Sequence, residues 1–126
     1  MSKAVLVVSG DSSHRDTLAA AVQGCGLEAR LCARTREAWE PLVRDDFLAV
    51  LSEDALPDGD FTSVICAVKL LRLNTPVIVV SPRDDWESCL AALDRGATDY
   101  LAYPPYAGEV ERSLATAGKV AVVAAA

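Results

Sequence analysis

Acidic side chains follow two of the apolar segments from which a sheet could form. Ser9-Gly10-Asp11 comes directly after the run 4–8, and Glu53-Asp54 follows the run 48–52. Carboxylates that converge in space can bind Mg²⁺ or Ca²⁺. No spacing in the chain matches an EF-hand loop, so we interpret the acidic residues as a solvated rim and expect no metal and no cofactor.

The other reactive residue types lack partners for catalysis. His14 is the only histidine, and without a cysteine nearby to complete a zinc site it is expected at the surface, in the first turn of a helix. Ser81 has no base in a recognisable triad arrangement. We therefore predict no catalytic residue and no enzymatic activity. The cysteines form no C-x-x-C pair and are expected to fill apolar positions: Cys25, Cys32, Cys66 and Cys89.

The loop from Ser9 to Ser13 leads from a predicted strand into a predicted helix. Backbone amides and the helix dipole at such a place can bind a phosphate group. Asp11 lies in the middle of the loop and would repel an anion. We favour plain capping of the helix by Ser12 or Ser13, and keep a small-molecule or phosphate binder as an alternative class of function.

Five short apolar runs alternate with helical patterns. The runs cover residues 4–8, 27–33, 48–52, 77–81 and 100–103. Strands separated by helical stretches of about 10 to 15 residues are typical of βαβ units, whose parallel strands are buried on both faces. We predict an α/β fold, a doubly wound five-stranded parallel sheet in the order 2-1-3-4-5, flavodoxin-like. Its site is expected at the carboxyl ends of the first and third strands.

Capping residues mark three of the helices. Ser13 with Asp16 has capping-box spacing, Asp60 can cap a third helix, and Asp84 with Glu87 opens a fourth. The apolar positions that follow recur at helical intervals. In the third helix they are Val64, Ile65, Val68 and Leu71, and in the fourth they are Cys89, Leu90 and Leu93.

The length of 126 residues and the 52% hydrophobic composition predict one globular domain over residues 1–118. A second helix, about 36–44, is weakened by Pro41. A fifth helix runs from about 106 to 117, and Gly118 is expected to end it. Residues 119–126 are then an apolar C-terminal tail or the root of a linker.

The charge and hydropathy of the chain exclude two kinds of partner. A net charge of −6 argues against nucleic acids, which are bound mainly through clustered Lys and Arg. No apolar run approaches the roughly 18 residues of a membrane helix, and the first residues show no signal-peptide pattern. We therefore expect no nucleic acid, no membrane and a cytoplasmic location.

Four segments at the right spacing resemble the receiver domains of two-component response regulators, over residues 4–117. The segments are 5–8, resembling the first strand; 49–60, the third strand and its Pro-containing loop; 76–81, the fourth strand; and 96–101, the approach to the fifth. The resemblance implies a CheY-like fold. It also implies phosphoryl chemistry that uses two acids after the first strand, an acceptor Asp, and a Lys after the fifth strand, with Mg²⁺ bound between them.

The residues that would carry this chemistry are replaced in this sequence. Ser9 and Gly10 occupy the positions of the acidic pair, Glu53 that of the acceptor, and Tyr103 that of the lysine. The two switch positions of the family remain, as Ser81 and Tyr100. The resemblance therefore indicates a degenerate pseudo-receiver, without Mg²⁺ in its pocket and signalling independently of phosphorylation; a receiver that is still phosphorylated atypically is the alternative.

Two questions about side chains stay open in the sequence. Glu53 either hydrogen-bonds Ser81 and imitates a phosphorylated state, or turns toward solvent. Trp86, Tyr103 and Tyr106 either anchor a partner or fill the space of the lost charges. As a partner we expect another protein, namely a kinase, an output domain or a second copy, and any homodimer is expected to use the fourth helix, fifth strand and fifth helix. We also expect a cis peptide bond between Tyr103 and Pro104.

Overall fold

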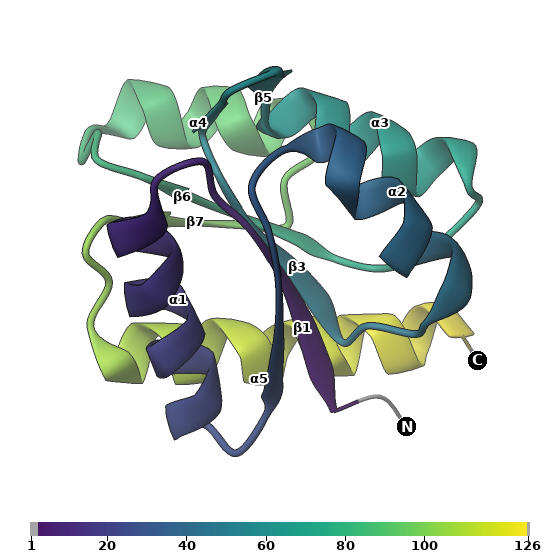
Figure 1. Ribbon diagram of the computed structural model, residues 1–126. Helices are drawn as coiled ribbons and strands as arrows, with labels where there is room; N and C mark the ends of the chain where they lie inside the picture. The colour runs from purple at the N-terminus through teal and green to yellow at the C-terminus, as the bar shows by residue number, and fades with distance from the viewer. Residues whose placement is uncertain (1–2, 126) are drawn as a thin grey trace.

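The computed structural model describes residues 3–125, and the side chains of all of these except Ala107 and 119–125 (Figure 1). Five parallel strands form one sheet in the order β2-β1-β3-β6-β7, so the predicted topology is confirmed. The unpredicted strands β4 (Ala55–Leu56) and β5 (Gly59–Asp60) pair antiparallel as a separate hairpin. The sheet strands are β1 (Ala4–Val8), β2 (Glu28–Cys32), β3 (Ala49–Glu53), β6 (Val77–Ser81) and β7 (Asp99–Ala102).

Helices cover both faces of the sheet (Figure 1). They are α1 (Ser12–Gly24), α2 (Thr35–Arg44), α3 (Phe61–Leu70), α4 (Trp86–Asp94) and α5 (Ala107–Ala125). Val5 and Val7 of β1 pack with α1 and α5, while Leu6 and Val8 pack with the helices of the other face. All four side chains are fully buried, which explains why the strand reads as an uninterrupted apolar run.

Helices α1, α3 and α4 each follow a capping aspartate, which in two cases is not the residue that the spacing suggested. Asp60 caps α3 as predicted, because its carboxylate accepts from the Thr62 amide. Asp11, rather than Ser12 or Ser13, caps α1, and Asp85, rather than Asp84, caps α4. The residue directly before a helix has an extended backbone, and a short carboxylate at that position reaches the free amides of the first turn. The cap is therefore the aspartate that directly precedes the helix.

Two helices differ from their predicted extents. Helix α2 begins at Thr35 and continues through Pro41, and Asp58 from the β4–β5 turn accepts hydrogen bonds from the Thr35 and Arg36 amides. Helix α5 does not end at Gly118; its backbone continues to Ala125, so 119–125 are helical and not a separate tail, while Ala126 lies outside the described residues. No helix in the described range is long and apolar enough to cross a membrane.

Candidate functional site

The predicted pocket positions meet at the carboxyl edge of the sheet. Ser9 follows β1, Glu53 ends β3, Ser81 ends β6 and Tyr103 follows β7. Parallel pairing of β1 with β3 and of β3 with β6 brings these ends to one side of the molecule. Ser9 and Ser81 are fully buried, and Glu53 and Tyr103 are half-buried. The predicted placement of these residues at one edge of the sheet is therefore confirmed, whereas the contacts of Glu53 differ from both expectations for this residue.

The Glu53 side chain neither hydrogen-bonds Ser81, as an imitation of the phosphorylated state requires, nor turns toward solvent. Its Oε1 atom accepts a hydrogen bond from the Ser9 hydroxyl at 2.7 Å and lies 2.8 Å from Nδ1 of His14. Only 13% of the Glu53 side chain is exposed. A carboxylate loses much of its hydration in such a position, and these two contacts replace part of it. Both expectations for Glu53 were wrong because neither included His14.

His14 belongs to the site rather than to the open surface. Its ring stacks against the ring of Tyr103, with centroids 4.0 Å apart and the planes tilted by 31°. Its Nε2 atom lies 4.0 Å from Oδ2 of Asp11, and 30% of the side chain is exposed. Sequence reasoning missed this role, although one signal was available. The first turn of the helix after β1 begins at the same sheet edge as the end of β3.

Gly10 occupies the position of the second acid, and the structure leaves no room there for a side chain. A Cβ atom on Gly10 would lie 2.6 Å from both Cδ and Cγ of Pro57, well inside van der Waals contact. Pro57 belongs to the turn between β4 and β5, next to the Asp58 that caps α2. The β4–β5 turn thus packs against Gly10 so closely that an acidic side chain at position 10 would not fit.

The two switch positions contact other groups than the pocket carboxylate. The Ser81 hydroxyl donates to Oδ2 of Asp54 at 3.2 Å and accepts from the Arg83 amide at 3.1 Å. The Tyr100 hydroxyl donates to the carbonyl of Arg83 at 2.6 Å. Both residues thus hold the loop between β6 and α4. The Tyr103–Pro104 bond is cis, as expected.

The loop from Ser9 to Ser13 offers little to a phosphate. Asp11 Oδ1 already accepts the Ser13 amide at 2.9 Å and the His14 amide at 3.1 Å. The His14 amide, above all, holds the pKa of the Asp11 carboxyl below its usual range. A charged carboxylate therefore fills the place where an anion would bind. This geometry does not support the alternative of a phosphate binder.

The acidic residues of this edge do not converge. Among the described residues no group of three or more His, Cys, Asp or Glu side chains is arranged to hold a metal ion. Five of the aspartates near the strand ends instead cap a helix or accept from a hydroxyl, and a sixth, Asp84, lies in the loop before α4; the five are Asp11, Asp54, Asp58, Asp60 and Asp85. The cysteines are unpaired, and burial, with a smaller contribution from Glu37, raises the pKa of Cys32 to about 12.

A second surface is formed by α4, β7 and the start of α5, and we call it the α4–β7–α5 face. Trp86, Leu90 and Leu93 follow one another at helical spacing on α4 and are 77%, 58% and 39% exposed. Leu90 and Leu93 were expected to face the core, but Ala92 is the buried residue of this helix. Tyr106, just before α5, is 79% exposed. Of the two roles that the sequence left open for Tyr103, an anchor or a filler of the pocket, its contact with the His14 ring favours the second.

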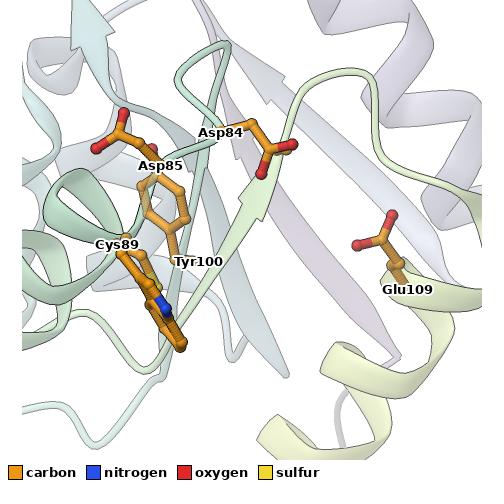
Figure 2. Close-up of a pocket in the computed structure, with 7 residues that line it drawn as sticks. Asp84, Asp85, Cys89, Tyr100 and Glu109 are labelled. Carbon is orange, nitrogen blue, oxygen red and sulfur yellow. The ribbon is translucent and has the colours of Figure 1, made fainter.

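The α4–β7–α5 face contains a hollow of about 370 Å³. Figure 2 shows side chains reaching it from the loop before α4, from α4, from β7 and from α5. Three of them are carboxylates, beside the phenol of Tyr100 and the indole of Trp86. The residues that line it are Asp84, Asp85, Trp86, Cys89, Tyr100, Ala102 and Glu109.

Several bacterial regulatory proteins have sequences similar to this chain. No protein-family model matches the chain. It is 28% identical to the response regulator protein PilR of Pseudomonas aeruginosa over 112 residues, which are 89% of this chain and 25% of that protein. It is 31% identical to the transcriptional regulatory protein ZraR of Escherichia coli over 100 residues, 79% of this chain and 23% of that protein. The chain thus spans about a quarter of the length of these relatives.

Solved structures show the same fold. A response-regulator receiver domain protein from Clostridium thermocellum superposes with a TM-score of 0.86 at 16% identity, covering 98% of this chain and 99% of that one. The beryllofluoride-activated NtrC4 receiver domain dimer superposes with a TM-score of 0.82 at 24% identity, covering 93% of this chain and 97% of that one. Together with the sheet order, these likenesses show that the chain has the fold of response-regulator receiver domains, and its sequence relatives include a response regulator as well.

Proposed function

We propose that this receiver domain signals by binding another protein and that its signalling does not depend on phosphorylation. The observation that carries the proposal is the state of Glu53, whose Oε1 atom is already engaged by Ser9 and His14. A carboxylate that attacks a phosphoryl group must present a free oxygen in line with the leaving group. The two partners on Oε1 fix the orientation of the carboxylate, and with only 13% of the side chain exposed they restrict the approach of a phosphoryl donor to the other oxygen.

The surroundings of Glu53 lack the charges that phosphoryl transfer requires. Mg²⁺ is held by carboxylate oxygens, and a fixed cation stabilises the charge that develops on the phosphoryl group. Ser9 supplies a hydroxyl, Gly10 has no room for a side chain, and the Tyr103 ring lies against His14. We accordingly propose neither a catalytic residue nor a magnesium ion for this pocket.

The α4–β7–α5 face is the surface we propose for the partner. Exposed aromatic and leucine side chains in one stripe are typical of interface anchors, because their burial excludes much water from apolar surface. Trp86, Leu90 and Tyr106 are each more than half exposed. The partner we propose is a kinase, an output domain or a second copy of the chain, acting in the cytoplasm and without contact to nucleic acid.

The phosphorylation half of the proposal is tested by intact-mass spectrometry after treatment with acetyl phosphate and Mg²⁺. We expect no phosphoryl adduct on the wild-type protein, nor on Glu53→Asp, because the shorter carboxylate still lacks the acidic pair and the lysine. Glu53→Gln is the control for modification elsewhere in the chain. An adduct that forms on the wild type and disappears in Glu53→Gln would contradict the proposal.

The interface half is tested by sedimentation velocity over a range of protein concentrations. Truncation of two anchors, Trp86→Ala with Tyr106→Ala, should weaken self-association more than tenfold, the usual effect of removing interface hot spots. Leu70→Ala is a matched control, since Leu70 is 67% exposed on α3, outside the proposed face. Association that survives the double substitution would place the dimer interface elsewhere. A wild-type chain that stays monomeric would exclude self-association and leave a different protein as the partner.

A further inference from the structure

His14 lies among three groups that respond to its charge. Its Nδ1 atom is 2.8 Å from Oε1 of Glu53, and its Nε2 atom is 4.0 Å from Oδ2 of Asp11. Its ring face lies against Tyr103 at a centroid distance of 4.0 Å. The three groups come from β3, from the loop before α1 and from the segment after β7. A single imidazole thus joins parts of the chain that are distant in sequence.

Both ring nitrogens of His14 face carboxylates, and this makes the arrangement depend on its proton. A neutral imidazole carries one N–H and can donate toward only one of the two carboxylates. An imidazolium carries two and attracts both. Histidine is also the side chain that ordinarily changes its charge between about pH 5 and 8. Protonation therefore strengthens the contacts of His14 to Glu53 and Asp11 together.

Protonation of His14 also strengthens its contact with Tyr103. A cation over the face of a tyrosine ring is attracted by the ring, whereas a neutral imidazole is held there only by packing. Tyr103 is also bound to the sheet edge, because its amide donates to the Ser81 carbonyl at 2.7 Å. The residues that follow it lead to Tyr106 at the start of α5. Weaker packing of the Tyr103 ring therefore loosens the segment 103–106.

The other charged groups around His14 do not reverse the strengthening of its contacts on protonation. Arg15 is the cation next to it in the chain, but its guanidinium donates to the Ser9 carbonyl at 2.9 Å. The pKa of Asp11 is held low, chiefly by the His14 amide, so this carboxylate remains charged throughout the range in which a histidine titrates. Glu53 and Tyr103 are the titratable groups that face the ring from the sheet.

We propose that His14 is a proton-sensitive latch: its imidazolium form holds Glu53, Asp11 and Tyr103 together, and its neutral form loosens Tyr103 and the segment 103–106. The latch gives this receiver an input other than a phosphoryl group, at the pocket where the phosphoryl group would have been. It depends on the His14 contacts alone and not on which partner the α4–β7–α5 face binds.

Amide hydrogen exchange measured by NMR between about pH 5.5 and 8 tests the latch. The readout is the protection factor of the Tyr103 amide, which is corrected for the intrinsic pH dependence of exchange. We expect protection to fall roughly two- to fivefold as the pH is raised through this range, the effect of losing a partly exposed cation–π contact. Because the chain has a single histidine, the titration of the His14 ring can be followed without ambiguity in the same samples.

His14→Gln is the decisive variant, since it keeps one donor for Glu53 but cannot titrate. Its Tyr103 protection should stay constant over the same pH range, and Tyr103→Phe, which keeps the ring, should retain the wild-type dependence in the amide of residue 103. Protection that does not change while His14 titrates would overturn the proposal. The same change in wild type and His14→Gln would also overturn it, because the dependence would then come from another group.

Discussion

Replacing Gly10 by alanine should destabilise the domain although both Gly10 and Pro57 lie at the surface. The added Cβ would stand 2.6 Å from two ring carbons of Pro57 and 3.5 Å from the carbonyl oxygen of Ala33. A proline ring cannot turn aside as the end of a long side chain can, so the backbone of the β4–β5 turn must move. That movement displaces Asp58, which caps α2 from the same turn.

The size of the effect follows from two opposing contributions. Inserting a methyl group into a packed site costs about 1 to 3 kcal/mol. Alanine also restricts the unfolded chain, which stabilises the folded state by about 0.4 to 1 kcal/mol relative to glycine. The clash is the larger contribution, and we expect a net loss of about 1 to 2 kcal/mol in the free energy of unfolding.

Urea denaturation followed by circular dichroism measures this loss as a lower midpoint at unchanged slope. Gly24→Ala is the matched control, since a Cβ at that position, the last residue of α1, meets no heavy atom within 4 Å. We expect it to be stabilising by about 0.4 to 1 kcal/mol. In a Pro57→Ala background the cost of Gly10→Ala should fall below about 0.5 kcal/mol, because the two substitutions act on one contact.

Two results would refute this reasoning: a Gly10→Ala variant as stable as Gly24→Ala, or a cost that remains unchanged in the Pro57→Ala background. The outcome also bears on the lost chemistry. The second acid that the family places at position 10 would meet the same proline ring. Restoring the acidic pair therefore requires a change at Pro57 before any carboxylate at position 10 can be accommodated.

Three further predictions concern single side chains. Asp58→Ala should lower the free energy of unfolding by about 1 kcal/mol near neutral pH, because the cap of α2 is lost. The Arg36 amide, and after it the Thr35 amide, lowers the pKa of Asp58 in the folded state. In urea titrations the stability difference between wild type and variant should therefore be complete above the ordinary pKa range of a carboxyl group and disappear as the pH falls below that range. Thiol labelling near pH 7.5, mapped by peptide mass, should modify exposed Cys66 in the folded protein and reach Cys32 only on unfolding, since burial raises the pKa of Cys32 to about 12. Thr35→Val should raise the urea midpoint by the equivalent of about 1 kcal/mol, because the buried Thr35 hydroxyl has no hydrogen-bond partner in the described part of the chain; a lower midpoint would show that it does.

Local signals in the sequence determined most of the fold. The uninterrupted apolar run of β1 predicted a strand buried on both faces, and its alternate residues do pack into two separate clusters. Asp60 predicted the start of α3. Strand spacing and the right-handed crossover then left one economical sheet order, which fixed the edge where the site lies. These features depend on neighbouring residues and on periodicity, which a sequence displays directly.

Other local signals were overruled by packing. Leu90 and Leu93 have helical spacing on α4, but the helix is rotated so that Ala92 faces the sheet and the leucines face outward. Gly118 is a common helix end, yet α5 continues to Ala125. Pro41 remains inside α2, a helix whose first turn is capped from a distant turn by Asp58. In each case the tertiary environment outweighs a preference of about 1 to 3 kcal/mol or less.

The contacts within the site were decided by tertiary structure alone. The sequence placed Ser9, Glu53 and Tyr103 at one edge, but not the ring of His14 that lies between two of them. His14 and Glu53 are separated by 39 residues, and the 2.8 Å between them depends on the register of β1 against β3 and on the rotation of α1. Sequence spacing can bring residues to the same edge of a sheet. Only the packed structure decides which of their atoms meet, because hydrogen bonds and ring contacts require agreement within a few tenths of an ångström.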